Sequence, residues 1–164
     1  MKIENILAEL KSEMIKWEYP VQDPIEKSFL ASILNRKPNA STIPVLEKLA
    51  DELCILFSSQ PDYITFLEYM DGFEYDGLTL YSLSTPEPLV KNLFVMNDFY
   101  RDNNDFIDPV LAERLVIGED SISLFTYDTN SKLFEIRDNI ATENVFGSFS
   151  DFNDFLEEIL DTVK

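Results

Sequence analysis

The chain is 164 residues long and strongly acidic, with 31 Asp and Glu against 13 Lys and Arg and a formal net charge of −18. This length suits a single domain, and with 45% hydrophobic residues the chain is expected to fold by itself. Its negative field repels nucleic acids and anionic membranes and attracts basic proteins. We therefore expect a protein partner, and neither nucleic acid nor membrane.

Cysteine use and the N-terminus favour the cytoplasm. The single cysteine, Cys54, stands among apolar residues, so no disulfide can form within the chain and a small core residue is expected. The N-terminus turns acidic at once, and no apolar run approaches the length of a membrane span. Neither a signal peptide nor a membrane anchor is expected.

Two amphipathic helices are predicted first. Apolar residues recur at three- and four-residue steps from Ile3 to Trp17, which is typical of a helix with one buried face. Asp23 followed by Pro24 is typical of a helix cap and a first helical residue. The second helix is therefore expected to begin at this pair and to end at Asn35.

Two further helices are predicted after a polar loop over residues 35–41. Thr42 and Pro44 open the third, whose apolar face extends to Phe57. Ser59, with an acid three residues later, is expected to cap the fourth helix, which Asp71-Gly72 should end in a left-handed turn.

After residue 72 the pattern changes to aromatic and β-branched residues at short spacing, which indicates strands. The predicted strands are Leu78–Tyr81, Leu115–Gly118, Ile122–Tyr127 and Leu133–Ile136. The last two flank a polar turn and predict a hairpin. Ser148 or Ser150 is expected to cap a last helix with one apolar stripe.

This order of elements predicts the α+β fold class, with N-terminal helices, a central, mainly antiparallel sheet and a C-terminal helix that packs on the sheet. No repeat, low-complexity tract or linker divides the sequence. Residues 1–164 are therefore predicted to form one domain, with a helical part over 1–60 and an α+β part over 61–164.

The sequence lacks the usual catalytic motifs. It contains no histidine, which removes the commonest general base and transition-metal ligand, and it has no glycine-rich phosphate loop. We predict no catalytic residue, no cofactor and no metal ligand. The acidic stretch from Asp98 to Asp108 resembles a calcium loop, but Phe106 and Ile107 occupy positions that need a ligand and a glycine. A solvated, partly helical surface is favoured there.

Two groups of residues have two interpretations each. Glu119-Asp120 is interpreted first as a tight turn, and in an enzyme these two residues with Asp128 would be the catalytic candidates, because all three stand at strand ends. Four aromatic residues lie outside the clearest apolar stripes and either pack in the core or anchor a contact surface. They are Phe73, Tyr75, Phe99 and Tyr100.

Several segments resemble the SUKH superfamily. Pro61–Gly72 and Asp76–Ser82 are similar to its hallmark helix, Asn/Asp-Gly turn and first strands. Leu115–Asp120, Leu124–Asp128 and Ser148–Leu156 are similar to its sheet and C-terminal helix. Within the superfamily the chain resembles the YrhA-like branch most.

Two departures accompany the resemblance: Gln60-Pro61 replaces the usual Leu-Pro before the helix, and Asp71 stands where Asn is common. The resemblance implies an α+β domain of bacterial immunity proteins, which bind and neutralise toxins of polymorphic and contact-dependent systems. Related regulators and scaffolds of eukaryotes, such as yeast cell-wall-synthesis regulators, share the domain. No catalytic residue is carried over.

The expected function is therefore a protein-binding module, an immunity protein with a basic toxin domain as partner. The alternatives are a scaffold or regulatory domain and, more remotely, a carboxylate- and metal-dependent enzyme. From residue 83 onward there are 17 acidic and 6 basic residues, a net charge of −11. The candidate partner-binding residues, chosen because they gather acid in this half, are Asp98, Tyr100, Asp102, Asp105, Asp108, Glu119 and Asp120.

Overall fold

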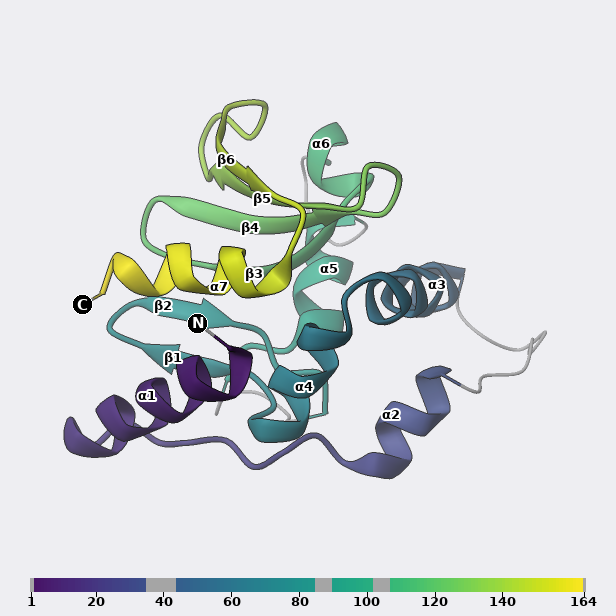
Figure 1. Cartoon of the computed structure of the whole chain (residues 1–164). Coiled ribbons are helices and arrows are strands. Elements are labelled where there is room, and N and C mark those ends of the chain that lie inside the picture. Colours follow the sequence, from purple (N-terminus) through teal and green to yellow (C-terminus); the bar gives the residue numbers. More distant parts are fainter. Residues whose placement is uncertain (1, 35–43, 85–89, 102–106, 164) are drawn as a thin grey trace.

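The computed structural model describes residues 2–34, 44–84, 90–101 and 107–163 (Figure 1). Its helices are α1 (Ile3–Lys16), α2 (Lys27–Leu34), α3 (Pro44–Ser59), α4 (Pro61–Tyr69), α5 (Leu93–Arg101), α6 (Pro109–Ala112) and α7 (Phe152–Asp161). Its strands are β1 (Phe73–Tyr75), β2 (Leu78–Leu80), β3 (Leu115–Glu119), β4 (Ser123–Asp128), β5 (Leu133–Asp138) and β6 (Val145–Phe149).

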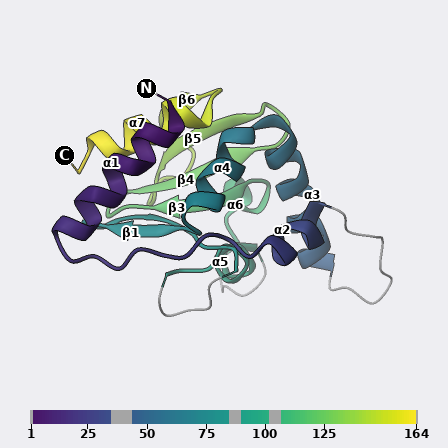
Figure 2. The ribbon, with the colours of Figure 1, turned by 60° about the horizontal axis from the view of Figure 1, so that its bottom comes forward.

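The strands form one six-stranded sheet in the order β1-β2-β3-β4-β5-β6, and every neighbouring pair is antiparallel. Helix α7 packs on one face of the sheet and helices α5 and α6 lie on the other (Figures 1 and 2). The α+β fold class, the meander and the closing helix are therefore confirmed. The sequence patterns missed β1, β6 and the short helix α6.

The second helix begins later than predicted. Helix α2 starts at Lys27, and the Asp23-Pro24 pair lies in an irregular segment before it. The backbone of this segment is bound to the end of α4, because the Ile25 N–H donates to the Leu67 carbonyl and the Asp23 carbonyl accepts from the Asp71 N–H. These long-range bonds replace the expected cap. The predicted loop over residues 35–41 lies outside the described residues.

The predicted serine caps are wrong. The residue before α4 that has non-helical geometry is Gln60, whereas the Ser59 hydroxyl donates back to the Ile55 carbonyl at 2.9 Å. At α7 the cap is Asp151, whose carboxylate accepts from the Asn153 N–H at 3.1 Å. An aspartate caps a helix N-terminus as well as a serine does, so neither Ser148 nor Ser150 is required as the cap of α7.

Trp17 was expected on the buried stripe of the first helix, but it is 60% exposed. It stands just after the last turn of α1, and its indole N–H donates to Glu13 at 3.2 Å. The single cysteine, Cys54, is half-buried in α3, and its thiol lies 3.1 Å from the Ile33 carbonyl.

The α7 face of the sheet is an aromatic core. Phe155 of α7 stacks on Phe134 with ring centroids 5.2 Å apart and meets Phe125 edge-on at 5.6 Å. Phe152 packs on Phe134 and on Tyr63 of α4, so α4 and α7 share one cluster. Burial of such rings, with their preferred tilted contacts, supplies most of the stability of this layer.

The opposite face of the same strands is polar and also buried. Glu135 lies across from Thr126, and its carboxylate accepts from Arg114 at 2.9 Å and from Arg137 at 2.7 Å. The guanidinium of Arg137 also donates to the Thr142 carbonyl at 2.7 Å. Because each charge has partners of the opposite sign or full hydrogen bonds, the cost of removing them from water is offset.

Two buried amides join the helices to the sheet. Asn97 of α5 donates to the Val116 carbonyl at 2.8 Å and accepts from the Val116 N–H at 2.9 Å, so its side chain replaces a neighbouring strand. Gln60 donates to the Ser150 carbonyl at 2.9 Å and accepts from the Phe152 N–H at 3.1 Å. The residue that departs from the SUKH-like pattern therefore fixes the start of α7.

Gly72 is left-handed as predicted, but it does not end α4, because the helix stops at Tyr69 and Met70 is already extended. Gly72 has φ +82°, and a Cβ there would lie 2.7 Å from the Ser82 nitrogen, so only glycine fits. The neighbouring Asp71 is fully buried, and its carboxylate accepts from the Leu83 N–H at 2.8 Å and the Ser84 N–H at 2.9 Å. The Asp-Gly pair thus holds the chain that follows β2. Among the described residues, no helix has the length and apolar character needed to cross a membrane.

Candidate functional site

A pocket of about 370 Å³ lies beside the end of β3, on the α6 side of the sheet. We name it the acidic pocket. It is lined by Tyr100, Asp108, Leu111, Glu119, Asp120, Leu124, Asn139, Ile140 and Thr142. Four of the seven predicted partner-binding residues meet here, from α5, from the cap of α6, from the end of β3 and from the turn after it.

Glu119 is the last residue of β3 and forms the centre of the polar contacts. Its Oε1 accepts from the Tyr81 hydroxyl at 2.8 Å and from the Lys91 ammonium at 2.9 Å. Lys91 is half exposed, so this ion pair is screened by solvent and contributes little to stability. It does hold the Glu119 carboxylate at the pocket wall.

The phenols beside Glu119 stay protonated in the folded chain. Burial raises the pKa of Tyr81, and the nearby Tyr100 and Glu119 raise it further. Burial also raises the pKa of Tyr100, and the Glu119 charge adds to this effect. Both hydroxyls are therefore donors at neutral pH, and neither supplies a base.

Asp108 caps helix α6. Its Oδ1 accepts from the Val110 N–H at 2.8 Å and the Leu111 N–H at 3.3 Å, and its Oδ2 accepts from the Thr142 hydroxyl at 2.6 Å. The carboxylate therefore connects the start of α6 to the turn between β5 and β6. Its charge is fixed at the pocket rim by these three donors.

Asp120 makes the tight turn that the sequence predicted. Its Oδ1 accepts from the Ile122 N–H at 2.9 Å and the Ser123 N–H at 2.7 Å. The Asn139 N–H donates to the Ile122 carbonyl, which ties this turn to the β5–β6 turn. Two isoleucines project from the joined turns, because Ile122 is 64% and Ile140 is 92% exposed.

The other predicted residues do not meet in this pocket. Asp98 is half-buried on α5 and does not line it. Asp102 and Asp105 lie outside the described residues. Ile140 was missed by the sequence reasoning, although an isolated isoleucine in the polar turn Asp138-Asn139-Ile140 was a usable signal of a functional apolar side chain.

The alternative grouping of Glu119-Asp120 with Asp128 is wrong in its geometry. Glu119 pairs with Leu124 at the start of β4, whereas Asp128 pairs with Leu133 at its end, so about 13 Å of strand separates them. Asp128 instead lies 3.6 Å from Arg114. Within the described residues, no group of three His, Cys, Asp or Glu side chains is placed to hold a metal ion.

The four aromatic residues for which the sequence allowed either core packing or a contact surface differ in their surroundings. Phe73 is fully buried in the core, and Tyr75 packs edge-on against Tyr19 at 4.9 Å. Phe99 is 44% exposed, and Tyr100 reaches the acidic pocket. Packing is therefore correct for Phe73, whereas Tyr75 both packs against Tyr19 and lines a pocket.

The acidic pocket is suited to hold a cationic side chain. Three fixed carboxylates line it, and the exposed Ile140 offers an apolar surface to the aliphatic stem of a Lys or Arg. Aromatic and apolar contacts next to opposite charges are typical of the centre of a protein interface.

Comparison with known proteins gives one clear relationship. No known family profile matches the chain, and no solved structure matches it. The uncharacterized protein YrhA of Escherichia coli strain K12 is 59% identical over 111 residues, which cover 68% of this chain and 80% of that protein. The chain therefore belongs to the same family as YrhA.

Proposed function

We propose that this chain is a SUKH-type immunity protein, which binds a basic toxin of a bacterial polymorphic or contact-dependent system and neutralises it. In this proposal the acidic pocket is the contact surface and the site of action is the cytoplasm. The toxin supplies a Lys or Arg for the pocket and an apolar patch for the two projecting isoleucines.

The observation that carries the proposal is the meeting of Tyr100, Asp108, Glu119 and Asp120 in one pocket. Three of the four are acidic, they come from separate segments of the chain, and the fold brings them together beside exposed isoleucines. A net charge of −18 would steer a basic partner toward the chain and speed its association. The acidic pocket would then hold the partner in one orientation.

The test first sequences the genes that flank the gene for this chain, where we expect a large toxin-type reading frame, and then uses its product; the absence of such a frame would count against the immunity role. We expect the two proteins to bind one to one and the toxin to lose its activity in the complex. We expect the association rate to fall about tenfold or more as the salt concentration rises from about 50 to 300 mM, because salt screens the attraction. A scaffold would bind without abolishing the activity of its partner.

The pocket is tested with Asp120→Asn, which keeps an oxygen for the turn N–H groups but removes the charge. We expect its association rate to fall about twofold at low salt. Glu68→Gln is the matched control, because Glu68 is exposed on α4 and loses the same charge away from the pocket. Equal effects of the two changes would move the contact surface elsewhere, and failure of the toxin to bind would reject the immunity role.

A further inference from the structure

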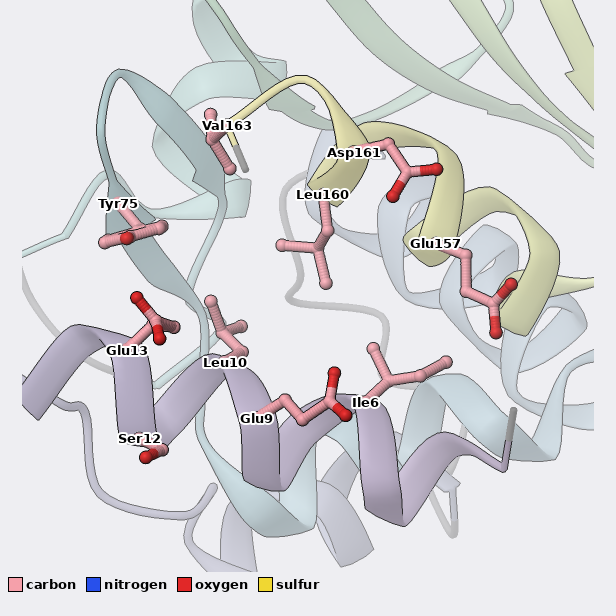
Figure 3. A pocket seen from close by; sticks show the side chains of 10 residues that line it. All are labelled: Ile6, Glu9, Leu10, Ser12, Glu13, Tyr75, Glu157, Leu160, Asp161 and Val163. Carbon is pink, nitrogen blue, oxygen red and sulfur yellow. The ribbon is translucent and has the colours of Figure 1, made fainter.

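A second surface with its own chemistry lies on the other side of the sheet. A groove of about 810 Å³ runs between α1 and α7, and β1 closes one end of it (Figure 3). We name it the α1–α7 groove. It is lined by Ile6, Glu9, Leu10, Ser12, Glu13, Tyr75, Glu157, Leu160, Asp161 and Val163. A volume of this size is typical of a binding site.

The lining alternates apolar and acidic side chains along both helices. On α1 the groove residues Ile6, Glu9, Leu10 and Glu13 are three and four positions apart, so they share one helical face. On α7, Leu160 stands next to Asp161 and faces α1 across the gap in Figure 3. Ile6, Leu10 and Leu160 are each 5% exposed and form the apolar floor.

The acidic rim continues beyond this groove. A recess of about 450 Å³ at the N-terminal ends of α1 and α7 is lined by Lys2, Ile3, Glu4, Asp62, Asp151 and Asn153. The two helices therefore begin at the same end and run side by side, as Figures 1 and 2 show. From Glu4 to Glu13 the seam is about 14 Å long, between two and three turns of a helix.

Negative charge dominates this seam. The groove and the recess together have seven carboxylates and one lysine in their linings. In the recess, burial raises the pKa of Asp62, and the neighbouring charges of Asp151 and Glu4 raise it further. A cation placed between the helices would relieve this repulsion between like charges.

We propose that the α1–α7 groove binds a cationic amphipathic helix of a partner protein. Two helices with an apolar floor between them offer the space of a third helix, and rows of carboxylates on both sides match Lys or Arg beside its apolar stripe. A second copy of this chain is a poor match, because each copy has a charge of −18. The site is separate from the acidic pocket and does not depend on the proposed function.

The chain has a natural reporter for this binding. Trp17 is its single tryptophan, is 60% exposed and donates to Glu13, which lines the groove. A helix that reaches Glu13 changes the surroundings of the indole. Its fluorescence therefore measures occupancy of the groove without a label.

The experiment titrates the whole chain with a synthetic helical peptide of about 14 residues, or four turns, with Leu at three- and four-residue steps and Lys on both sides. We expect a change in Trp17 fluorescence and one-to-one binding by calorimetry. A peptide of the same composition in scrambled order should bind at least about tenfold more weakly, because it has no apolar stripe.

Two variants with equal charge changes locate the site. Glu9→Gln with Glu157→Gln should weaken peptide binding about tenfold, whereas Glu68→Gln with Glu143→Gln, at exposed positions that line neither the groove nor the acidic pocket, should change it less than about twofold. Equal binding of both peptides, or equal effects of both variant pairs, would overturn the proposal, because the attraction would then be that of a general polyanion. A dimer detected by sedimentation and abolished by Glu9→Arg would assign the groove to a second copy and overturn it too.

Discussion

The two faces of the sheet are both buried, but they are built from opposite kinds of side chain. On the α7 face, Phe134 stacks on Phe155, and rings from α4 complete the layer. On the α6 face, the neighbouring residue Glu135 joins Arg114 and Arg137 in an ionic cluster. Adjacent residues on one strand therefore enter an aromatic core on one side and a charge network on the other.

This difference shows how the fold supports a binding surface. Aromatic burial stabilises the domain and requires only matching shapes. The ionic cluster adds less stability than the aromatic layer does. It is connected to the acidic pocket, because Arg137 donates to the Thr142 carbonyl and the Thr142 hydroxyl donates to Asp108. The polar face therefore holds the residues of the acidic pocket in position, and the apolar face stabilises the domain.

The largest effect is expected on the aromatic face. Phe155→Ala should lower the free energy of unfolding by about 4 kcal/mol, because it leaves a cavity among Phe125, Phe134 and Phe152. Urea denaturation checks the value. Phe99→Ala, at an exposed ring, is the control and should cost less than about 1 kcal/mol. A similar cost for both would contradict an aromatic core at α7.

On the polar face, Arg137→Met should cost about 3 kcal/mol, because it leaves part of the buried Glu135 charge without its partner. The Thr142 carbonyl also loses a donor, so hydrogen exchange should become faster in the β5–β6 turn. Lys11→Met, at an exposed position, is the control. If Arg137→Met were neutral, the charge network would not hold this face together.

The aromatic face was largely predictable from the sequence, and the polar face was not. Periodic apolar residues mark α1, α3 and α7, and alternation along Leu133–Ile136 marks a strand. The same alternation makes Glu135 and Arg137 look solvent-facing, because local pattern carries no information on whether α6 covers them. Their burial depends on contacts between segments far apart in the chain.

The acidic residues of the candidate site were predictable from the sequence, and its exposed isoleucines were not. Charge surplus and turn chemistry pointed to Asp108, Glu119 and Asp120, which need only local structure to reach the surface. Ile122 and Ile140 come together because the Asn139 N–H binds the Ile122 carbonyl across two turns. Hydrogen bonds between distant segments also explain why Asp23-Pro24 does not start α2, because the backbone of that segment is hydrogen-bonded to the end of α4 instead.

Two hydroxyls on adjacent residues give a matched comparison of the faces. Thr126 donates to the Glu135 carboxylate at 3.1 Å, and the Tyr127 hydroxyl shares a hydrogen bond with Ser59 at 2.5 Å. Thr126→Val should cost about 2 kcal/mol and Tyr127→Phe about 1 kcal/mol, because hydrogen bonds to charged groups are stronger. Urea denaturation measures both. The reverse order would mean that the Arg partners alone satisfy Glu135.

The smallest effect is a loss of stability in alkali, to which both sides of the sheet contribute. Burial raises the pKa of Tyr63, which packs on Phe152, and the Asp71 charge raises it further. The unfolded chain releases this proton near pH 10, before the folded chain does. Stability from Tyr63 is therefore complete below pH 10 and falls above it, by about 1 kcal/mol at pH 11.

Tyr63→Phe should remove the part of the alkaline loss that comes from Tyr63. The measurement is the difference in unfolding free energy between pH 8 and pH 11, which lies about one pH unit above the ordinary pKa of tyrosine. Tyr81→Phe, beside the acidic pocket, should also flatten the alkaline slope, but it loses the Glu119 hydrogen bond at every pH. An alkaline slope that neither variant changes would assign the loss to other groups. A slope changed by Tyr63→Phe alone would place the alkaline sensitivity on the aromatic side of the sheet.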